Sequence, residues 1–174
     1  MRKFTIRDLT LAAMLAGLYA ILTLVLPIPQ YHGVQLRVAE AMTVLPFLFP
    51  AAVPGLFVGC VIANLASPFP MDVVFGSAAT LMAAVLTQRM PHRYLAPLPP
   101  VLCNALIVGA EVAWIQTGFG DAFWAAYAMN ALSVGFGQLV ACYVLGLPLL
   151  RALPQVPFFR AMIPADRLTR LNIM

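Results

Sequence analysis

The feature of this sequence that most constrains its fold is where the positive charges fall relative to the apolar blocks. Nine of the ten Lys and Arg residues lie outside those blocks or at their ends, in three clusters. The clusters are Arg2, Lys3 and Arg7; Arg89 and Arg93; and Arg151, Arg160, Arg167 and Arg170. Cytoplasmic loops of membrane proteins carry an excess of Lys and Arg. If six segments cross the membrane, all three clusters face the cytoplasm.

The composition indicates an integral membrane protein. The chain of 174 residues is 63% hydrophobic and 9% charged, whereas about 25% of the residues in a soluble domain are charged. This length accommodates about six helices of roughly 20 residues, so we expect a single integral-membrane domain over residues 1–174. The net charge of +4 marks the cytoplasmic face, where basic residues meet anionic lipid, and does not indicate nucleic-acid binding.

The expected fold class is all-α, a polytopic membrane protein of six transmembrane helices with both termini cytoplasmic. The predicted helices cover residues 9–26, 36–49, 51–66, 72–88, 101–117 and 122–150, followed by a basic tail. The second helix is short, since about 14 residues cover only about 21 Å of a core of about 30 Å. If it did not cross, Arg89 and Arg93 would face outside, contrary to the positive-inside rule.

Polar side chains within the predicted spans gather in the outer half of the bundle. They are Arg37, Glu40, Asn64, Asp72, Asn104, Glu111 and Asn130. Asn104 precedes Glu111 by seven residues, which in an α-helix puts both on one face two turns apart. Polar groups inside a membrane mark functional sites, so the cluster predicts a pocket open to the outside. The inner half has almost no ionisable group, and Gln138 is its main uncharged exception.

Several of these residues also have a structural interpretation. Arg37 and Glu40 are three residues apart and can form an interfacial ion pair. Asp72, at the start of a helix, can satisfy the free amides there. Asn64 and Asn104 can join helices by hydrogen bonds.

Glu111 is harder to explain structurally, because no Lys or Arg lies within four residues of it. A carboxylate at that depth needs a cationic or donor-rich partner, from the protein or from a ligand. Trp114, Trp124 and Tyr127 at the same level can stack on a planar ligand, although the tryptophans fit an aromatic belt equally well. The linker PQYHGVQ between the first two helices is a candidate lid.

Small residues form a stripe along the first predicted helix. Ala12, Ala16 and Ala20 recur every four residues on one face, and Ala13 and Gly17 form a second pair beside them. Such faces allow helices to approach closely in lipid. The stripe therefore serves either packing within the chain or docking of another membrane protein.

The chain contains no nucleotide-binding loop, zinc motif or catalytic triad spacing, and we expect neither a cofactor nor enzymatic activity. Uphill transport would therefore require a partner that hydrolyses nucleotide.

Four stretches of the chain resemble the QueT family of queuosine-precursor transporters. They are LTLAAMLAGLYAILTLVLP, VQLRVAEAMTVLPFLFPAAVPGLFVGCVIANL, DVVFGSAATLMAA and CNALIVGAEVAW. These proteins are substrate-binding S-components of energy-coupling factor (ECF) transporters. The resemblance implies a six-helix S-component bundle that docks a membrane-embedded coupling subunit, itself attached to two cytoplasmic ATPases. It also implies that Ala12, Ala16 and Ala20 form the coupling face, with Gly17 beside them.

The resemblance implies a 7-deazaguanine base, such as preQ0, preQ1 or queuine, as the substrate. A guanine-like base presents a ring N–H and an exocyclic NH₂ side by side, and one carboxylate accepts both in a strong bidentate pair. On this chemistry Glu111 holds the base, and Asn104 and Asn130 read its other edge atoms. A cationic aminomethyl substituent would favour a second acid, Asp72 or Glu40.

Three other functions are open at this point. An S-component for a riboflavin- or biotin-like vitamin would share the fold, but a negatively charged ligand would disfavour Glu111. A small membrane enzyme acting on lipid would require acids or histidines at the cytoplasmic interface, where this chain offers mostly Arg. A structural or assembly protein would not need Glu111 in the outer half.

Overall fold

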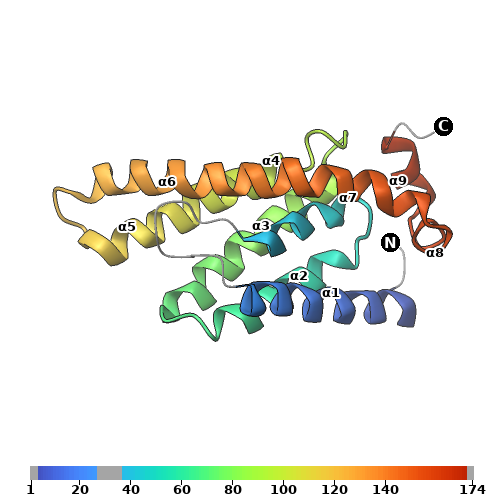
Figure 1. Cartoon of the computed structure of the whole chain (residues 1–174), viewed down its shortest axis with the longest axis horizontal. Helices are drawn as coiled ribbons and strands as arrows, with labels where there is room; N and C mark the ends of the chain where they lie inside the picture. The colour runs from blue at the N-terminus through green and yellow to red at the C-terminus, as the bar shows by residue number, and fades with distance from the viewer. Residues whose placement is uncertain (1–3, 27–36, 172–174) are drawn as a thin grey trace.

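The structure, a computed structural model, describes residues 4–26 and 37–171, and these form helices without strands (Figure 1). The elements in chain order are α1 (Ile6–Val25), η1 (Val38–Phe47), α2 (Ala52–Asn64), η2 (Pro70–Val73), α3 (Phe75–Arg89), α4 (Leu98–Cys103), η3 (Asn104–Val108), α5 (Gly109–Thr117), α6 (Phe123–Leu139), η4 (Val140–Gly146), α7 (Leu147–Ala152), η5 (Leu153–Gln155), α8 (Pro157–Arg160) and α9 (Ala165–Arg170). Of the η elements, η3 and η4 are π-helices and the others are 3-10 helices. The predicted all-α class is confirmed.

Four helical stretches are long and apolar enough to cross a membrane. They are Ile6–Val25, Pro70–Arg89, Leu98–Thr117 and Phe123–Gln155. The second and third predicted spans correspond to two shorter apolar helices, η1 and α2. The chain is thus a multi-pass membrane protein, and the crossing of η1 and α2 stays a prediction.

The short second helix is a 3-10 helix inside the bundle. Ten residues in this form rise about 20 Å, compared with about 15 Å in an α-helix, so η1 reaches further than its length suggests. Every residue from Ala39 to Phe47 is buried, and η1 packs against α1, α3 and η4. Other helices therefore shield η1 from lipid.

The first helix begins where a capping box forms. The Thr5 hydroxyl accepts from the Asp8 amide at 3.3 Å, and the Thr5 amide donates to the Asp8 carboxylate at 2.9 Å. This pair satisfies amides that have no partner within the first turn of a helix. The helix therefore starts at Ile6, slightly before the predicted residue 9.

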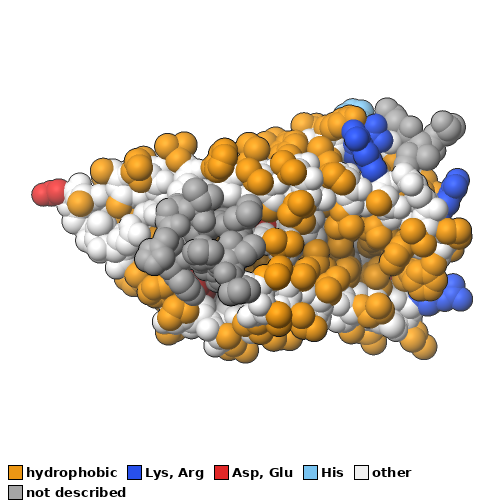
Figure 2. All heavy atoms as spheres, viewed as in Figure 1, with side chains coloured by type: hydrophobic (Ala, Val, Ile, Leu, Met, Phe, Trp, Pro, Cys, Tyr) orange, Lys and Arg blue, Asp and Glu red, His pale blue; other side chains and the backbone are white. Residues whose placement is uncertain are grey.

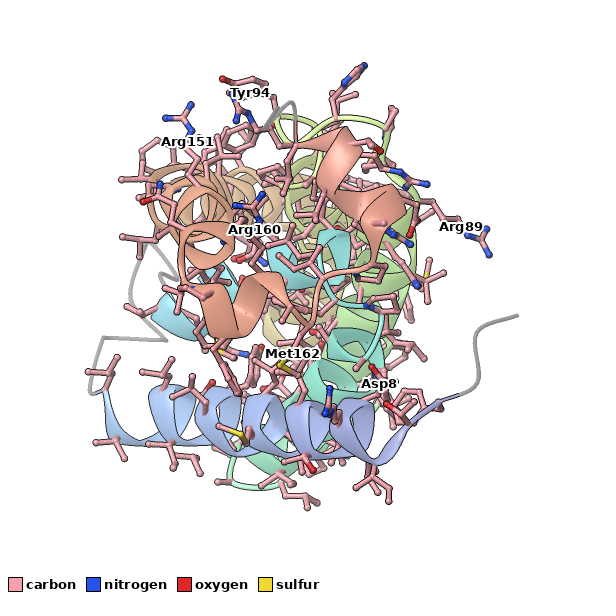
Figure 3. All side chains as sticks on the ribbon, turned by 90° about the vertical axis from the view of Figure 1, so that its right-hand side faces the viewer. Asp8, Arg89, Tyr94, Arg151, Arg160 and Met162 are labelled. Atoms are coloured by element: carbon pink, nitrogen blue, oxygen red, sulfur yellow. The ribbon has the colours of Figure 1, made fainter. Side chains whose placement is uncertain are left out.

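The described basic clusters lie together at one end of the bundle, as the charge pattern predicts. Figure 2 shows Arg side chains gathered at this end of the visible face, and Figure 3 looks onto it, with Arg89, Arg151 and Arg160 labelled. Arg2 and Lys3 lie outside the described residues, as does the linker considered as a lid. We call this the arginine-rich end, which the positive-inside rule assigns to the cytoplasm, and the opposite one the outer end.

The C-terminal segment folds onto the arginine-rich end and does not extend away as a simple basic tail. Arg167 of α9 is buried and donates to the carbonyl oxygens of Phe47, at 3.4 Å, and Gln88. Leu171 is fully buried, and its carbonyl accepts from Arg93 at 3.2 Å. These bonds join the ends of η1 and α3 to the C-terminal segment.

Helices α1 and α2 pack backbone to backbone. A Cβ atom on Gly55 would lie 2.6 Å from the Ala12 carbonyl oxygen, and one on Gly59 would lie 2.7 Å from that of Ala16. Only glycine permits this approach, which explains why the two helices lie together along their lengths.

The alanine stripe is buried by this packing. Ala12, Ala16 and Ala20 are 7%, 6% and 6% exposed, so α2 covers the face that the sequence offered for partner docking. The structure therefore uses Ala12 and Ala16 for packing within the chain. Gly17 faces outward, since a Cβ atom added to it would have no atom within 4 Å. Of the four residues predicted to dock a partner, Gly17 is therefore the one that stays exposed.

We predict that Gly59→Val destabilises the protein by about 1–3 kcal/mol, because the new side chain forces α1 away from α2. Gly17→Val is the matched control and should have little effect, since its side chain meets open space. Thermal unfolding of the purified proteins in one detergent measures both. Equal unfolding temperatures would contradict the backbone-to-backbone contact.

Candidate functional site

A cavity of about 220 Å³, lined by polar and apolar side chains, lies between the start of η1, η2, the η3–α5 stretch and the middle of α6. Its lining residues are Arg37, Phe69, Asp72, Val108, Val112, Ile115, Gln116, Asn130, Ser133 and Val134. We call it the Arg37 cavity. The structure thus brings together Arg37, Asp72 and Asn130, which the sequence places in one pocket.

A narrow space lies beside the Arg37 cavity and shares Arg37, Val108 and Val134 with it. Its other lining residues are Glu40, Asn104 and Gln138, and its volume is about 20 Å³. That is room for about one water molecule. The Asn104 side-chain NH₂ is buried, and no residue in the described ranges accepts a hydrogen bond from it.

Glu40 is held by neutral donors from two other helices. The Tyr19 hydroxyl donates to one carboxylate oxygen at 2.6 Å, and the Gln138 amide donates to the other at 2.8 Å. Glu40 is 4% exposed, so this pair replaces the water that a buried carboxylate loses. Both carboxylate oxygens of Glu40 thus accept from donors other than Arg37.

Asp72 is held in the wall of the Arg37 cavity. The Ser67 hydroxyl donates to its carboxylate at 2.5 Å, and the Asn64 side chain donates to its carbonyl at 2.8 Å. Asn64 also donates to the Ser77 hydroxyl at 3.3 Å. Asn64 therefore lies behind Asp72 and joins α2 to η2 and α3, as the hydrogen-bonding interpretation of this residue predicts.

Glu111 is a buried acid whose two carboxylate oxygens receive no hydrogen bond from the described residues. It is 6% exposed, and neither carboxylate oxygen accepts a hydrogen bond from any described residue. Two charged groups act on it: Asp72, whose carboxyl group lies within hydrogen-bonding reach of that of Glu111, and Arg37. A second acid beside an unpaired buried carboxylate is unfavourable, so Glu111 is a position where donors from a ligand would be stabilising.

Glu111 opens onto an apolar groove of about 490 Å³ between α3 and α5. The groove is lined by Met71, Phe75, Leu106, Ile107, Ala110, Glu111, Trp114, Phe119 and Phe123, and we call it the Trp114 groove. Successive residues of α5 thus face different spaces: Val112 lines the Arg37 cavity, whereas Glu111 lines the groove. Glu111 lies at the boundary between a polar cavity and an aromatic groove.

The predicted aromatic residues take different positions. Trp114 lies in the groove, with its ring centroid 6.2 Å from that of Phe119. Tyr127 stacks on Phe123, with centroids 6.1 Å apart and an interplanar angle of 8°. Trp124 is 73% exposed, which fits an aromatic belt.

The expectation that Asn104 and Glu111 share a helix face is wrong. Asn104 lines the narrow space with Gln138, whereas Glu111 lines the Trp114 groove. The intervening element η3 is a π-helix, and its wider turn changes the register that an uninterrupted α-helix would keep.

Sequence reasoning missed Tyr19 and Gln116 and misplaced Gln138. Tyr19 seemed an ordinary apolar residue of the first helix, and nothing local indicates its bond to Glu40, which is 21 positions away. Gln116 accepts from Asn130 at 2.8 Å, and its amide in an apolar span was a signal that could have been used. Gln138 belongs to the same cluster as Glu40 and is not an isolated inner exception.

Comparison with known proteins identifies one family. The profile of the QueT transporter family matches residues 9–155. The queuosine precursor transporter QueT of Lactococcus lactis subsp. cremoris (strain MG1363) is 32% identical over 84 residues, which are 47% of this chain and 50% of the relative. The match thus spans about half the length of that curated relative. No solved structure matches the chain.

We predict that the same substitution destabilises the protein at one acid and not at another. Glu40→Met leaves the Tyr19 hydroxyl and the Gln138 amide without an acceptor, which costs about 2 kcal/mol or more. Glu111→Met removes a buried carboxyl group whose oxygens accept from no described donor, so it should be neutral or stabilising. Unfolding temperatures of the two variants in one detergent test this, and equal losses would contradict the distinction.

Proposed function

Because this chain belongs to the QueT transporter family, we propose that it is the substrate-binding membrane subunit of an energy-coupling factor transporter. In this role it captures a queuosine precursor, a 7-deazaguanine base, on the extracellular side. A membrane-embedded coupling subunit and two cytoplasmic ATPases then drive uptake. The chain itself is a multi-pass transporter protein of the cell membrane and not an enzyme.

The observation that carries this proposal is the buried Glu111 carboxylate, which accepts from no described donor and lies beside an aromatic wall. No described residue donates to either of its oxygens, and a guanine-like base offers a ring N–H and an exocyclic NH₂ with the matching spacing. Trp114, Phe75 and Phe119 line the same groove. A planar base that donates to Glu111 therefore has aromatic rings next to its faces, which favours stacking.

A base that extends from the Trp114 groove past Asp72 into the Arg37 cavity meets further polar groups, since Asn104 and Asn130 line the adjoining spaces and not the groove itself. The Asn104 NH₂ has no acceptor among the described residues and can donate to a ring carbonyl through one water molecule in the narrow space that it lines. Asn130 already donates to Gln116 and to the Ala126 carbonyl, which leaves its side-chain oxygen to accept from the ligand. Asp72, near Glu111, offers a second negative charge for a cationic aminomethyl substituent.

The outward face of α1 is the surface that we assign to the coupling subunit. Ala13 and Gly17 are exposed there, together with Met14, Leu18 and Ile21. Small residues beside apolar ones allow another membrane helix to approach closely. This assignment replaces the buried alanine face, which α2 already covers.

Binding to the purified protein tests the proposed substrate. Calorimetric titration with preQ0, preQ1, queuine, guanine and riboflavin should show selective binding of a 7-deazaguanine. Glu111→Gln should weaken that binding about 10-fold to 100-fold, because an amide replaces one acceptor with a donor and removes the charge. Asp121→Asn is the matched control, since it removes an exposed charge in the turn between α5 and α6, and binding should be unchanged.

Other outcomes reject distinct parts of the proposal. Binding of riboflavin in place of the deazaguanines would exclude the substrate but leave the subunit's role in transport. Selective deazaguanine binding that survives Glu111→Gln would keep the substrate and exclude the Glu111 site. Because Glu111→Gln is expected to fold stably, an unfolding temperature equal to that of the unsubstituted protein assigns any lost binding to the site.

A further inference from the structure

Two arginines from distant parts of the chain converge on one tyrosine at the arginine-rich end. Arg93, in the loop between α3 and α4, donates to the Tyr94 hydroxyl at 3.2 Å, and Arg151 of α7 donates to the same oxygen at 3.1 Å. Their guanidinium carbons lie 4.9 Å and 5.9 Å from the centroid of the Tyr94 ring. Figure 3 shows Tyr94 and Arg151 together at the edge of this end.

This cluster carries positive charge that no carboxylate among the described residues neutralises. The described ion pair at this end joins Arg167 to Asp166, and in residues 4–26 and 37–171 no carboxylate pairs with Arg93 or Arg151. The two guanidinium groups lower the pKa of the Tyr94 hydroxyl by hydrogen bonding and by their charge. Like charges held close together repel, so an added anion would stabilise the arrangement.

The donors of the two guanidinium groups are only partly used. Each guanidinium has five N–H donors. Arg93 uses others for the Leu171 carbonyl, at 3.2 Å, whereas the described bond of Arg151 is the one to Tyr94. Phosphate oxygens accept from arginine in a planar, bidentate geometry, so the remaining donors fit a phosphate group.

Exposed apolar residues follow or precede the cluster within about two helical turns along the chain. Tyr94 is 50% exposed, and α4, which starts four residues later, exposes Leu98 (39%) and Leu102 (50%). Val144 is 60% exposed and precedes Arg151 by seven residues, about two helical turns. The basic cluster therefore lies at the boundary between an apolar, lipid-facing surface and the cytoplasmic end.

We propose that Arg93, Tyr94 and Arg151 form a binding site for the phosphate headgroup of one anionic phospholipid of the cytoplasmic leaflet. Its acyl chains lie along the exposed side chains of α4 and η4. Basic sites at the cytoplasmic ends of helices bind anionic headgroups in this way. The apolar surface beside the arginines favours a lipid over free inorganic phosphate, which would gain nothing from it.

Native mass spectrometry of the full chain in detergent, with added phosphatidylglycerol or phosphatidylcholine of the same acyl chains, tests the site. Arg151→Gln should weaken phosphatidylglycerol binding about five-fold, the effect of one basic residue at an anionic surface. Binding of phosphatidylcholine should not change. Arg160→Gln is the matched control, because Arg160 lies at the same end (Figure 3) but outside the cluster, and it should leave phosphatidylglycerol binding intact.

A second variant separates the geometry of the site from its charge. Arg151→Lys keeps the positive charge but loses the planar pair of donors that matches a phosphate group. It should therefore bind phosphatidylglycerol more weakly than the unsubstituted protein and more strongly than Arg151→Gln.

Three results would overturn the proposal. Equal losses in Arg151→Gln and Arg160→Gln would show a general charge effect with no defined site. Unchanged binding in Arg151→Gln would exclude the cluster. Displacement of phosphatidylglycerol by inorganic phosphate would assign the site to free phosphate.

Discussion

The described bundle depends on how one buried carboxylate is satisfied. Glu40 lies within the membrane protein's interior, where an unpaired charge is costly, and it accepts hydrogen bonds from Tyr19 of α1 and Gln138 of α6. The same residue's carbonyl accepts from Thr43 at 2.6 Å. Three segments that are far apart in the sequence are thereby joined around η1, which allows a short 3-10 helix to occupy the centre of the bundle.

The three buried acids of the outer half differ in how many of their acceptors the protein uses. Glu40 has both oxygens engaged, and Asp72 accepts from Ser67 through one oxygen. Neither oxygen of Glu111 accepts a hydrogen bond from a described residue. A buried acid stabilises the fold only when its oxygens accept hydrogen bonds. The number of bonded oxygens therefore separates Glu40 and Asp72, which hold the fold, from Glu111, which we assign to the ligand.

The two proposed binding sites lie towards opposite ends of the molecule and use opposite charges. Towards the outer end, the unpaired Glu111 suits a ligand that donates hydrogen bonds. At the arginine-rich end, Arg93 and Arg151 around Tyr94 suit an anion. A headgroup bound there would hold the loop after α3 against α7, and the Arg93 bond to Leu171 would extend that contact to the C-terminal segment.

The class of fold could be predicted from the amino-acid sequence, because the apolar blocks report directly on the membrane. The gathering of the described arginines at one end could be predicted in the same way, and the assignment of that end to the cytoplasm stays a prediction. Glu111 could be singled out in the same way, since an acid without a nearby basic residue is visible locally. The partners of the buried groups could not be predicted. The bond between Glu40 and Gln138 spans 98 positions, the π-helix η3 separates Asn104 from Glu111, and the close approach at Gly59 buries Ala16. Such contacts depend on how helices pack in three dimensions, which hydrophobic patterning along one chain does not specify.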